Sequence, residues 1–483
     1  MKRLASETAT YGVSTILARV LNFLFVPIYT RMLTPGDYGI ATDFLAYIAI
    51  LQVLLTMGME TGSLRYANKS DKPREVFSTA FVFVGAIAVL FFALVASWSG
   101  DIARWMHYDD FRMCIIYVGG ILAIDSITAI LFARLRFEYH AAKFTVFKSV
   151  KIAAELGFNF LLFFGAPAYF AAHPDSWLLH FVSATPDFSY ILFAIFLSCI
   201  VALVLFIPDL RTIKPRFDKT LWRQMTVYAL PLMIAGLPGV ANEFIDRILF
   251  RYFLPGDVVW QEQLGLFQAG VKIAVLMSLF IQMFRYAAEP HFFAGEKNKQ
   301  APMHLAVVMN HFTAFCMAIF LFVMFYIDAI GLLLGKDFRA GLDIVPVMLG
   351  AYVLLGMSFN ISMWYKLSGK THYAVYITTA GLLVTVAVNV LFMPAYGYHA
   401  AAWGHFFSYL VMVILSAWLG ARHYPVPYNW LKLWAYISVA LALFFLSGWI
   451  DIHALWGKWT VNAILLLAYV AFWLRCEKIK LHA

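Results

Sequence analysis

Residues 31–37 read R-M-L-T-P-G-D, and residues 251–257 read R-Y-F-L-P-G-D. Four positions, which lie 220 residues apart, are the same in both stretches: Arg31, Pro35, Gly36 and Asp37 in the first, and Arg251, Pro255, Gly256 and Asp257 in the second. Each copy follows a long apolar run. The repeat predicts a chain built twice from one helical unit.

The composition is that of a membrane protein. The 483 residues are 63% hydrophobic and 13% charged, with a mean hydropathy of +0.77, whereas soluble domains have about 45–50% apolar and about 25% charged residues. The four cysteines, Cys114, Cys199, Cys316 and Cys476, lie inside or at the ends of apolar runs without C-x-x-C spacing. We therefore interpret them as inert apolar residues, not as disulfides or metal ligands.

A membrane-spanning helix needs about 20 mostly apolar residues. The sequence has fourteen such runs, at about 8–30, 38–60, 76–98, 111–133, 143–166, 187–207, 224–250, 264–287, 302–328, 342–365, 372–394, 398–420, 429–448 and 458–475. The first run lacks a clean small-residue cleavage site, so we expect a transmembrane helix there and not a removed signal peptide. We predict an all-α polytopic membrane protein of about 14 transmembrane helices.

The net charge is +9, and the positive residues are distributed among the loops as in a membrane protein. If the N-terminus is cytoplasmic, the loops that alternate to the inside hold 26 Lys and Arg residues, and those outside hold 8. Cytoplasmic loops carry this excess in membrane proteins, and a missed or false helix would invert every later loop. The charges therefore predict fourteen spans with both termini cytoplasmic, and we expect no nucleic-acid partner.

The two repeated stretches then have a defined orientation. They follow the first and seventh runs, which both lead outward in this topology. Six helices per unit is an even number, so the two units have parallel topology, with a substrate site expected between them near the midplane. We predict an N-terminal lobe at 1–215, a C-terminal lobe at 216–422, and two additional helices with a cytoplasmic tail at 423–483.

Several motifs resemble a known family. They are Y-T-R-M-L-T-P-G-D-Y-G (29–39), M-G-M-E-T-G-S-L-R-Y (57–66), L-R-F-E-Y-H-A-A-K-F (135–144), Y-A-L-P-L-M-I-A-G-L-P (228–238), I-D-R-I-L-F (245–250), and G-K-D-F-R-A-G, L-S-G-K-T-H-Y and N-V-L-F-M-P-A-Y-G-Y-H-A-A-A-W-G within 335–408. In order and spacing they resemble the Wzx-like polysaccharide (O-antigen) flippases. These belong to the multidrug/oligosaccharidyl-lipid/polysaccharide exporter superfamily. The resemblance covers the first twelve runs.

The resemblance implies two six-helix lobes that translocate a polyprenyl-diphosphate-linked oligosaccharide across the bacterial inner membrane by alternating access. Membrane lipids and other polysaccharide assembly proteins would be its partners, and lipopolysaccharide O-antigen is one surface polymer that it would serve. A drug/cation antiporter of the same superfamily is the first alternative. A membrane polysaccharide polymerase or ligase is the second, but the outer loops are short and show no nucleophile motif or metal cluster. We therefore expect no enzyme chemistry and no cofactor.

Two cations inside apolar runs are candidates for substrate binding. Arg19 lies in the first run and Lys272 in the eighth. A charge inside the membrane persists mainly where it faces a cavity or a partner, and a guanidinium holds diphosphate oxygens well. The alternative is that each cation neutralises a buried carboxylate in its own lobe.

Four acids inside apolar runs are candidates for a coupling site for H⁺ or Na⁺: Asp43, Asp125, Glu155 and Glu243. Transport against a gradient needs a second ligand with different affinity for the two states. The alternative is a structural ion pair, such as Glu155 with Lys151 one turn away or Glu243 with Lys272. For the repeated stretches we expect a mechanical role, in which Arg31 and Arg251 cap the last carbonyls of their helices and form an outer hinge.

Overall fold

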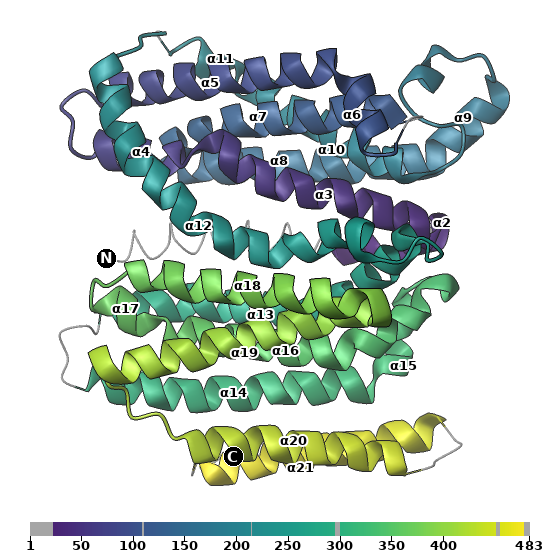
Figure 1. The fold of residues 1–483 in the computed structure, drawn as a ribbon, viewed down its shortest axis with the longest axis vertical. Helices are drawn as coiled ribbons and strands as arrows, with labels where there is room; N and C mark the ends of the chain where they lie inside the picture. The colour runs from purple at the N-terminus through teal and green to yellow at the C-terminus, as the bar shows by residue number, and fades with distance from the viewer. Residues whose placement is uncertain (1–22, 109–110, 214, 295–299, 451–454, 478–483) are drawn as a thin grey trace. The chain divides into compact units, whose positions relative to one another are not determined.

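The protein is helical throughout the part of the chain that its computed structural model describes, which is residues 23–108, 111–213, 215–294, 300–450 and 455–477 (Figure 1). The α-helices are α2 (Val26–Met32), α3 (Pro35–Thr56), α4 (Met59–Ala67), α5 (Pro73–Ser97), α6 (Ser99–Trp105), α7 (Arg112–Phe137), α8 (Ala141–Phe160), α9 (Ala166–Ala172), α10 (Phe188–Leu205), α11 (Ile207–Leu210), α12 (Lys219–Phe253), α13 (Trp260–Ala294), α14 (Ala301–Phe325), α15 (Ile327–Ile330), α16 (Val345–Ile361), α17 (Met363–Leu367), α18 (His372–Tyr396), α19 (Tyr398–His423), α20 (Trp430–Trp449) and α21 (Leu455–Cys476). No strand occurs within those ranges.

Thirteen of the described helical stretches are long and apolar enough to cross a membrane. They correspond one to one with the second to fourteenth runs expected from the sequence, which confirms the all-α polytopic class. The first expected run, at about 8–30, falls mostly on residues 1–22 and so lies largely outside the described residues. Only its end is seen, in α2.

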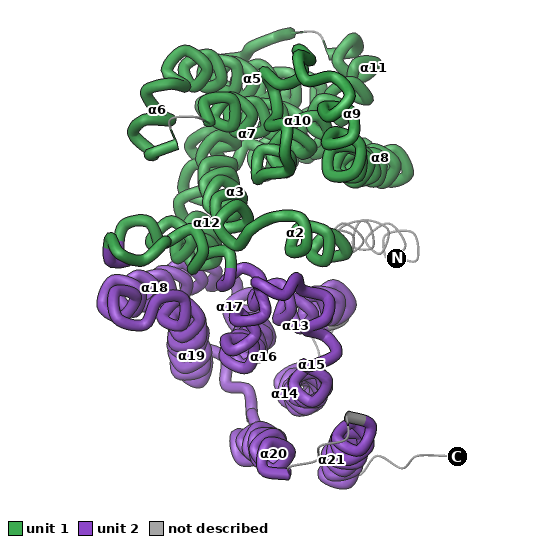
Figure 2. Tube along the Cα trace, turned by 90° about the vertical axis from the view of Figure 1, so that its right-hand side faces the viewer, with its two compact units in different colours: residues 1–252, 256–265 green, residues 253–255, 266–483 purple. Residues whose placement is uncertain are grey.

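Contacts divide the chain into two compact units (Figure 2). Unit 1 holds residues 1–252 and 256–265, and unit 2 holds 253–255 and 266–483. Helix α12 and the first turn of α13 therefore pack with unit 1. The expected lobes, 1–215 and 216–422, were defined by the repeat in the sequence, whereas these units are defined by contacts. The contacts do not test the lobe boundary at residue 216, which stays a prediction.

Helix α7 is the centre of unit 1 and packs against α3, α4, α5, α8 and α10. Small residues on α7 let its neighbours approach closely, as is typical of helix packing in membranes. A Cβ atom on Gly120 would lie 2.3 Å from a ring carbon of Phe196 in α10. By contrast, Val89 and Leu90 of α5 are exposed, as expected for side chains that face lipid.

Three spans in unit 1 depart from a regular straight helix. Between α3 and α4, Met57 and Gly58 adopt left-handed backbone conformations, and a Cβ on Gly58 would lie 2.7 Å from the Ala229 carbonyl oxygen. Helix α8 continues through a π-helical turn into α9, which ends at Ala172, so the run expected to end at 166 extends further. Helix α12 contains two interior prolines, Pro231 and Pro238, which break backbone hydrogen bonds, and it changes direction along its length (Figure 1).

Unit 2 is built around α16 and α19, with α14 and α18 packed against them. The last two spans, α20 and α21, attach to this group through α14. Asn462 of α21 donates to the Phe325 carbonyl oxygen at 2.9 Å, and the Tyr469 hydroxyl donates to that of Ala314 at 3.2 Å. These two buried bonds join α21 to α14, and α20 packs against the same helix.

Candidate functional site

The first copy of the repeated stretch forms the beginning of α3. Thr34 is the residue before the helix, and its hydroxyl accepts a hydrogen bond from the Asp37 backbone N–H at 3.1 Å. The Asp37 carboxylate in turn accepts from the Thr34 backbone N–H and hydroxyl. With Pro35 in the first turn, this is a complete capping box. The stretch therefore starts the following helix, and Arg31, exposed in the last turn of α2, lies before it.

The second copy differs at the capping position. Leu254 stands where the first copy has Thr34, so no side-chain hydroxyl is present to cap the helix. Pro255, Gly256 and Asp257 are exposed, and α13 begins only at Trp260. The same four residues therefore occupy two different local structures.

Arg251 makes the contact that distinguishes the second copy. Its Nη2 atom lies 2.8 Å from Oδ2 of Asp43, and their side chains are 7% and 0% exposed. A second nitrogen, Nη1, donates to the Met106 carbonyl oxygen at 2.9 Å. We expected Arg251 to cap the last carbonyls of its own helix. Its partners are instead the Asp43 carboxylate in α3 and the Met106 carbonyl just after α6, so that expectation is wrong.

Aromatic side chains enclose this ion pair. The guanidinium carbon of Arg251 lies 4.4 Å from the ring centre of Tyr108 and 4.7 Å from that of Trp260, a favourable cation–π geometry. The Tyr108 hydroxyl donates to Asp43 Oδ2 at 3.0 Å. Burial, and secondarily the Asp43 charge, raises the pKa of Tyr108 far above its ordinary value, so the hydroxyl stays a donor.

Backbones cross closely beside the ion pair. A Cβ on Gly39 would lie 1.9 Å from the Gln261 carbonyl oxygen, and one on Gly265 would lie 1.9 Å from that of Pro35. Only glycine permits this approach, because any larger side chain would overlap backbone atoms. The start of α3 thus packs against the start of α13 at two glycines, and the buried ion pair beside them joins α3 to the end of α12 within unit 1.

A second polar group follows one face of α8. Lys148, Lys151, Glu155 and Asn159 recur at helical spacing along it. The Lys151 ammonium donates to Asp125 Oδ1 at 2.6 Å, and the Asn159 side-chain carbonyl accepts from the hydroxyl of Tyr29 at 2.8 Å. Lys151 is therefore the cationic partner of Asp125, whereas the sequence analysis gave it as a possible partner of Glu155.

The other predicted residues are spread over the molecule. Arg19 lies outside the described residues. Lys272 is half-buried in the unit 2 part of α13, and Glu243 is exposed on α12. Asp246 and Arg247 of α12 form the local pair that their spacing indicates, at 3.6 Å. Two of the predicted acids therefore have cationic partners that the sequence did not assign to them. Asp43 pairs with Arg251, and Asp125 pairs with Lys151.

Sequence reasoning missed the link from Asp43 to Arg251, Tyr108 and Trp260, because they come from four separate segments. The one available signal was the acid itself, since a buried carboxylate requires a partner. Within the described ranges, no group of three His, Cys, Asp or Glu side chains is arranged to hold a metal ion.

A family model described as "Polysaccharide biosynthesis protein" matches residues 4–296. The chain belongs to this family. The match confirms the family resemblance that the sequence motifs indicated. No curated protein matches the sequence.

Solved structures share the fold. The lipid II flippase MurJ in an inward closed conformation aligns over 97% of this chain and 99% of its own, with a TM-score of 0.74 at 11% identity. A MATE protein in complex with MaD3S aligns over 90% and 97%, with a TM-score of 0.58 at 14% identity. An outward-facing multidrug resistance MATE family transporter of the MOP superfamily aligns over 90% and 96%, with a TM-score of 0.53 at 13% identity. At these identities the likeness concerns the fold.

Proposed function

We propose that the protein is a flippase that moves a lipid-linked oligosaccharide across a membrane. The observation that carries the proposal is the polysaccharide biosynthesis family match over residues 4–296. The fold adds support, because the alignment with a lipid II flippase covers nearly both whole chains. The cargo would be a polyprenyl-diphosphate-linked glycan, the membrane the bacterial inner membrane, and both termini cytoplasmic.

Alternating access requires that one end of the protein be closed while the other is open. The contacts between the starts of α3 and α13, together with the Asp43–Arg251 pair, would serve as the closed outer end. An ion pair this well buried is costly to break by removing one partner. It would still form and separate reversibly if water and new partners reach both charges when the outer end opens.

The cargo itself requires a cationic, wet path for its diphosphate. Arg19 and Lys272 remain the proposed contacts for these phosphate oxygens. The acids Asp43, Asp125, Glu155 and Glu243 remain the proposed sites for H⁺ or Na⁺ coupling. Lys151 favours a structural role for Asp125, since its ammonium lies 2.6 Å from one carboxylate oxygen.

A drug/cation antiporter is the second candidate, because MATE transporters have the same fold. Their TM-scores, 0.58 and 0.53, are lower than the 0.74 of the lipid II flippase. A polymerase or ligase is the candidate of another class, and the family match does not favour catalysis.

Reconstitution tests the proposal directly. Purified protein in vesicles should move a fluorescent polyprenyl-diphosphate-linked oligosaccharide between leaflets, and should not move cationic drugs. Drug transport without lipid flipping would establish the antiporter instead. In cells, deleting the gene should stop surface glycan export while lipid-linked units still form inside. Surface glycan units that appear without chain elongation would indicate a polymerase.

The role of Arg19 has its own test. Arg19→Ala should abolish flipping while the protein stays in the membrane, and Arg19→Lys should keep part of it. Full activity of Arg19→Ala would exclude this residue as the diphosphate contact.

A further inference from the structure

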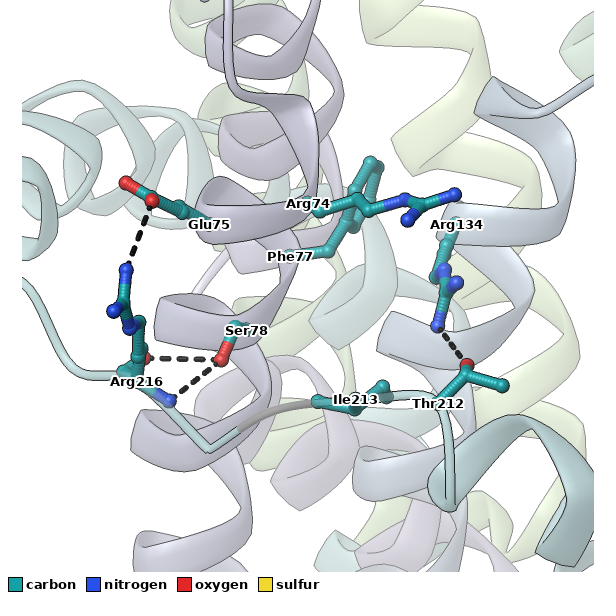
Figure 3. Close-up of a pocket in the computed structure, with 8 residues that line it drawn as sticks. All are labelled: Arg74, Glu75, Phe77, Ser78, Arg134, Thr212, Ile213 and Arg216. Carbon is teal, nitrogen blue, oxygen red and sulfur yellow. Dashed lines mark hydrogen bonds and ion pairs between the residues drawn. The ribbon is translucent and has the colours of Figure 1, made fainter.

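A pocket of about 300 Å³ lies in unit 1 where α5 begins and α7 ends (Figure 3). Its lining residues are Arg74, Glu75, Phe77, Ser78, Arg134, Thr212, Ile213 and Arg216. The volume is at the lower end of the range of small-ligand sites, about 300–1,000 Å³. The distribution of charges in the sequence predicts that this end of the unit is cytoplasmic.

The pocket has an excess of positive charge. Three of its lining residues are arginines and only one, Glu75, is acidic. Glu75 Oε1 lies 3.3 Å from Nη1 of Arg216, in a contact largely exposed to solvent. Arg74 is exposed and forms no ion pair with any described residue. Glu138, which does not line the pocket, pairs with Arg134 at 2.8 Å. Arg74 is therefore the one lining arginine without a described carboxylate partner, and the group as a whole keeps one positive charge in excess.

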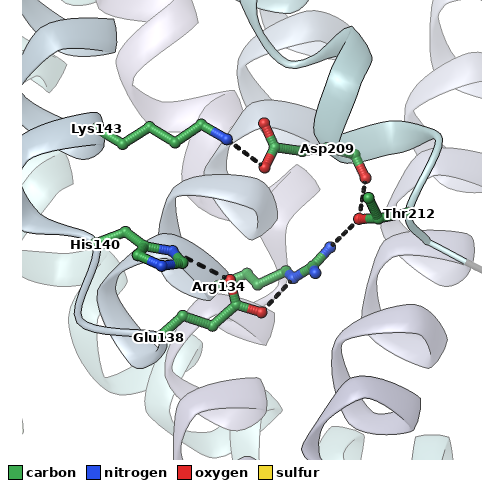
Figure 4. Close-up of polar contacts among 6 residues, drawn as sticks. All are labelled: Arg134, Glu138, His140, Lys143, Asp209 and Thr212. Carbon is green, nitrogen blue, oxygen red and sulfur yellow. Dashed lines mark hydrogen bonds and ion pairs between the residues drawn. The ribbon is translucent and has the colours of Figure 1, made fainter.

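Arg134 is fixed in position before any ligand arrives (Figure 4). Its Nε donates to Glu138 at 2.8 Å, and its Nη1 donates to the Thr212 hydroxyl at 3.2 Å. Thr212 belongs to a turn held by Asp209, whose carboxylate accepts from Lys143 at 2.6 Å. A guanidinium held in this way loses little conformational entropy when it binds an anion.

The main chain beside the pocket is also held in place. The Ser78 hydroxyl donates to the Arg216 carbonyl oxygen at 3.0 Å and accepts from the Arg216 N–H at 2.9 Å, which fixes this arginine's main chain. Helix α5 begins beside the pocket at Pro73, and no side chain caps its first turn. Its positive dipole end adds to the arginine charges.

The position of the pocket favours a lipid over a soluble anion. It lies at the level of the helix ends, where phospholipid headgroups meet a membrane protein. Phe217, the residue after Arg216, has 49% of its surface exposed, and exposed aromatic residues are typical of this interface. We propose that the pocket binds the phosphate of an anionic lipid headgroup in the inner leaflet. This proposal does not depend on the proposed function.

The test compares two matched double variants in nanodiscs of phosphatidylcholine containing phosphatidylglycerol. Arg74→Gln/Arg216→Gln removes two pocket charges, and Arg211→Gln/Arg223→Gln removes two exposed charges nearby that do not line the pocket. Native mass spectrometry then counts the phosphatidylglycerol retained by each protein. A basic residue that acts on a bound anionic headgroup contributes about fivefold, so we expect roughly 25-fold weaker binding for the pocket variant. The control variant should retain clearly more lipid, because its two arginines do not line the pocket.

A charge-retaining variant, Arg74→Lys/Arg216→Lys, should keep most of the binding, which separates loss of charge from loss of folding. Equal retention by the pocket variant and the control variant would overturn the proposal. A further arm titrates the purified protein in detergent with inorganic phosphate. Phosphate binding as tight as that of phosphatidylglycerol, with the same dependence on Arg74 and Arg216, would make this a site for soluble phosphate and overturn the lipid assignment.

Discussion

Replacing Arg251 by Met tests the energetic weight of the buried ion pair. The substitution keeps an unbranched apolar stem but removes the guanidinium. It leaves the Asp43 carboxylate, which is 0% exposed, with only the Tyr108 hydroxyl as a described partner. Leaving one member of a buried pair alone costs about 3–5 kcal/mol. The bond to the Met106 carbonyl is also lost, which adds about 1 kcal/mol.

At about 2 °C per kcal/mol for a large unit, we expect the melting temperature to fall by about 8–12 °C. The assay is thermal unfolding in detergent with a thiol-reactive dye, because Cys114, Cys199 and Cys316 are buried and react only as the fold opens. The control is Arg104→Met, since Arg104 pairs with Asp101 on the surface and exposed pairs contribute about 0.2–1 kcal/mol.

The double variant Asp43→Asn/Arg251→Met gives the decisive comparison. It removes both charges, so it should recover more than half of the stability lost in Arg251→Met. Together with the single variant Asp43→Asn it completes a double-mutant cycle, in which the coupling energy is the effect of the double variant minus the effects of the two single variants. If the double variant instead loses the sum of the two single effects, the charges do not stabilise one another and the reasoning above is refuted.

Three further predictions concern unit 1. Lys151→Met should destabilise the protein by about 3 kcal/mol and Asp125→Asn/Lys151→Met by much less, as measured by thermal unfolding; equal losses would disprove the pairing. Gly120→Ala should cost about 1–3 kcal/mol, because the new methyl group overlaps a ring of α10, whereas Gly85→Ala, which has open space, should be neutral or stabilising. Thr34→Ala should cost about 1 kcal/mol of stability through loss of the capping box, while Thr34→Ser should cost only a few tenths; a neutral Thr34→Ala would mean that the cap does not stabilise α3.

Membrane spans were predictable because length and apolarity are properties of one continuous segment. Thirteen runs agree with helices of the structure, and the exceptions are local, such as the π-helical turn that carries the run expected to end at 166 on to Ala172. The family resemblance was predictable for the same reason, since motifs are read directly along the chain.

Partners of the intramembrane charges were not predictable in the same way. Asp43 and Arg251 are 208 residues apart, and a single sequence shows that a buried acid needs a cation without showing which one. Proximity in sequence misled for Lys151, which has Glu155 one turn away but donates to Asp125 on another helix. The two repeated stretches, 31–37 and 251–257, also have different local structures. Thr34 has a hydroxyl that caps α3, and Leu254 at the equivalent position has none.

The pairing of Asp43 with Arg251 has a consequence for the response to voltage. A single charge that crosses the membrane field gains or loses about 2.3 kcal/mol per 100 mV. Joined at 2.8 Å, the carboxylate and the guanidinium have no net charge, so the membrane potential does almost no work on them when they move as one body. While the pair is closed, any voltage dependence of transport must then come from the cargo, from the coupling ion or from charges elsewhere in the chain.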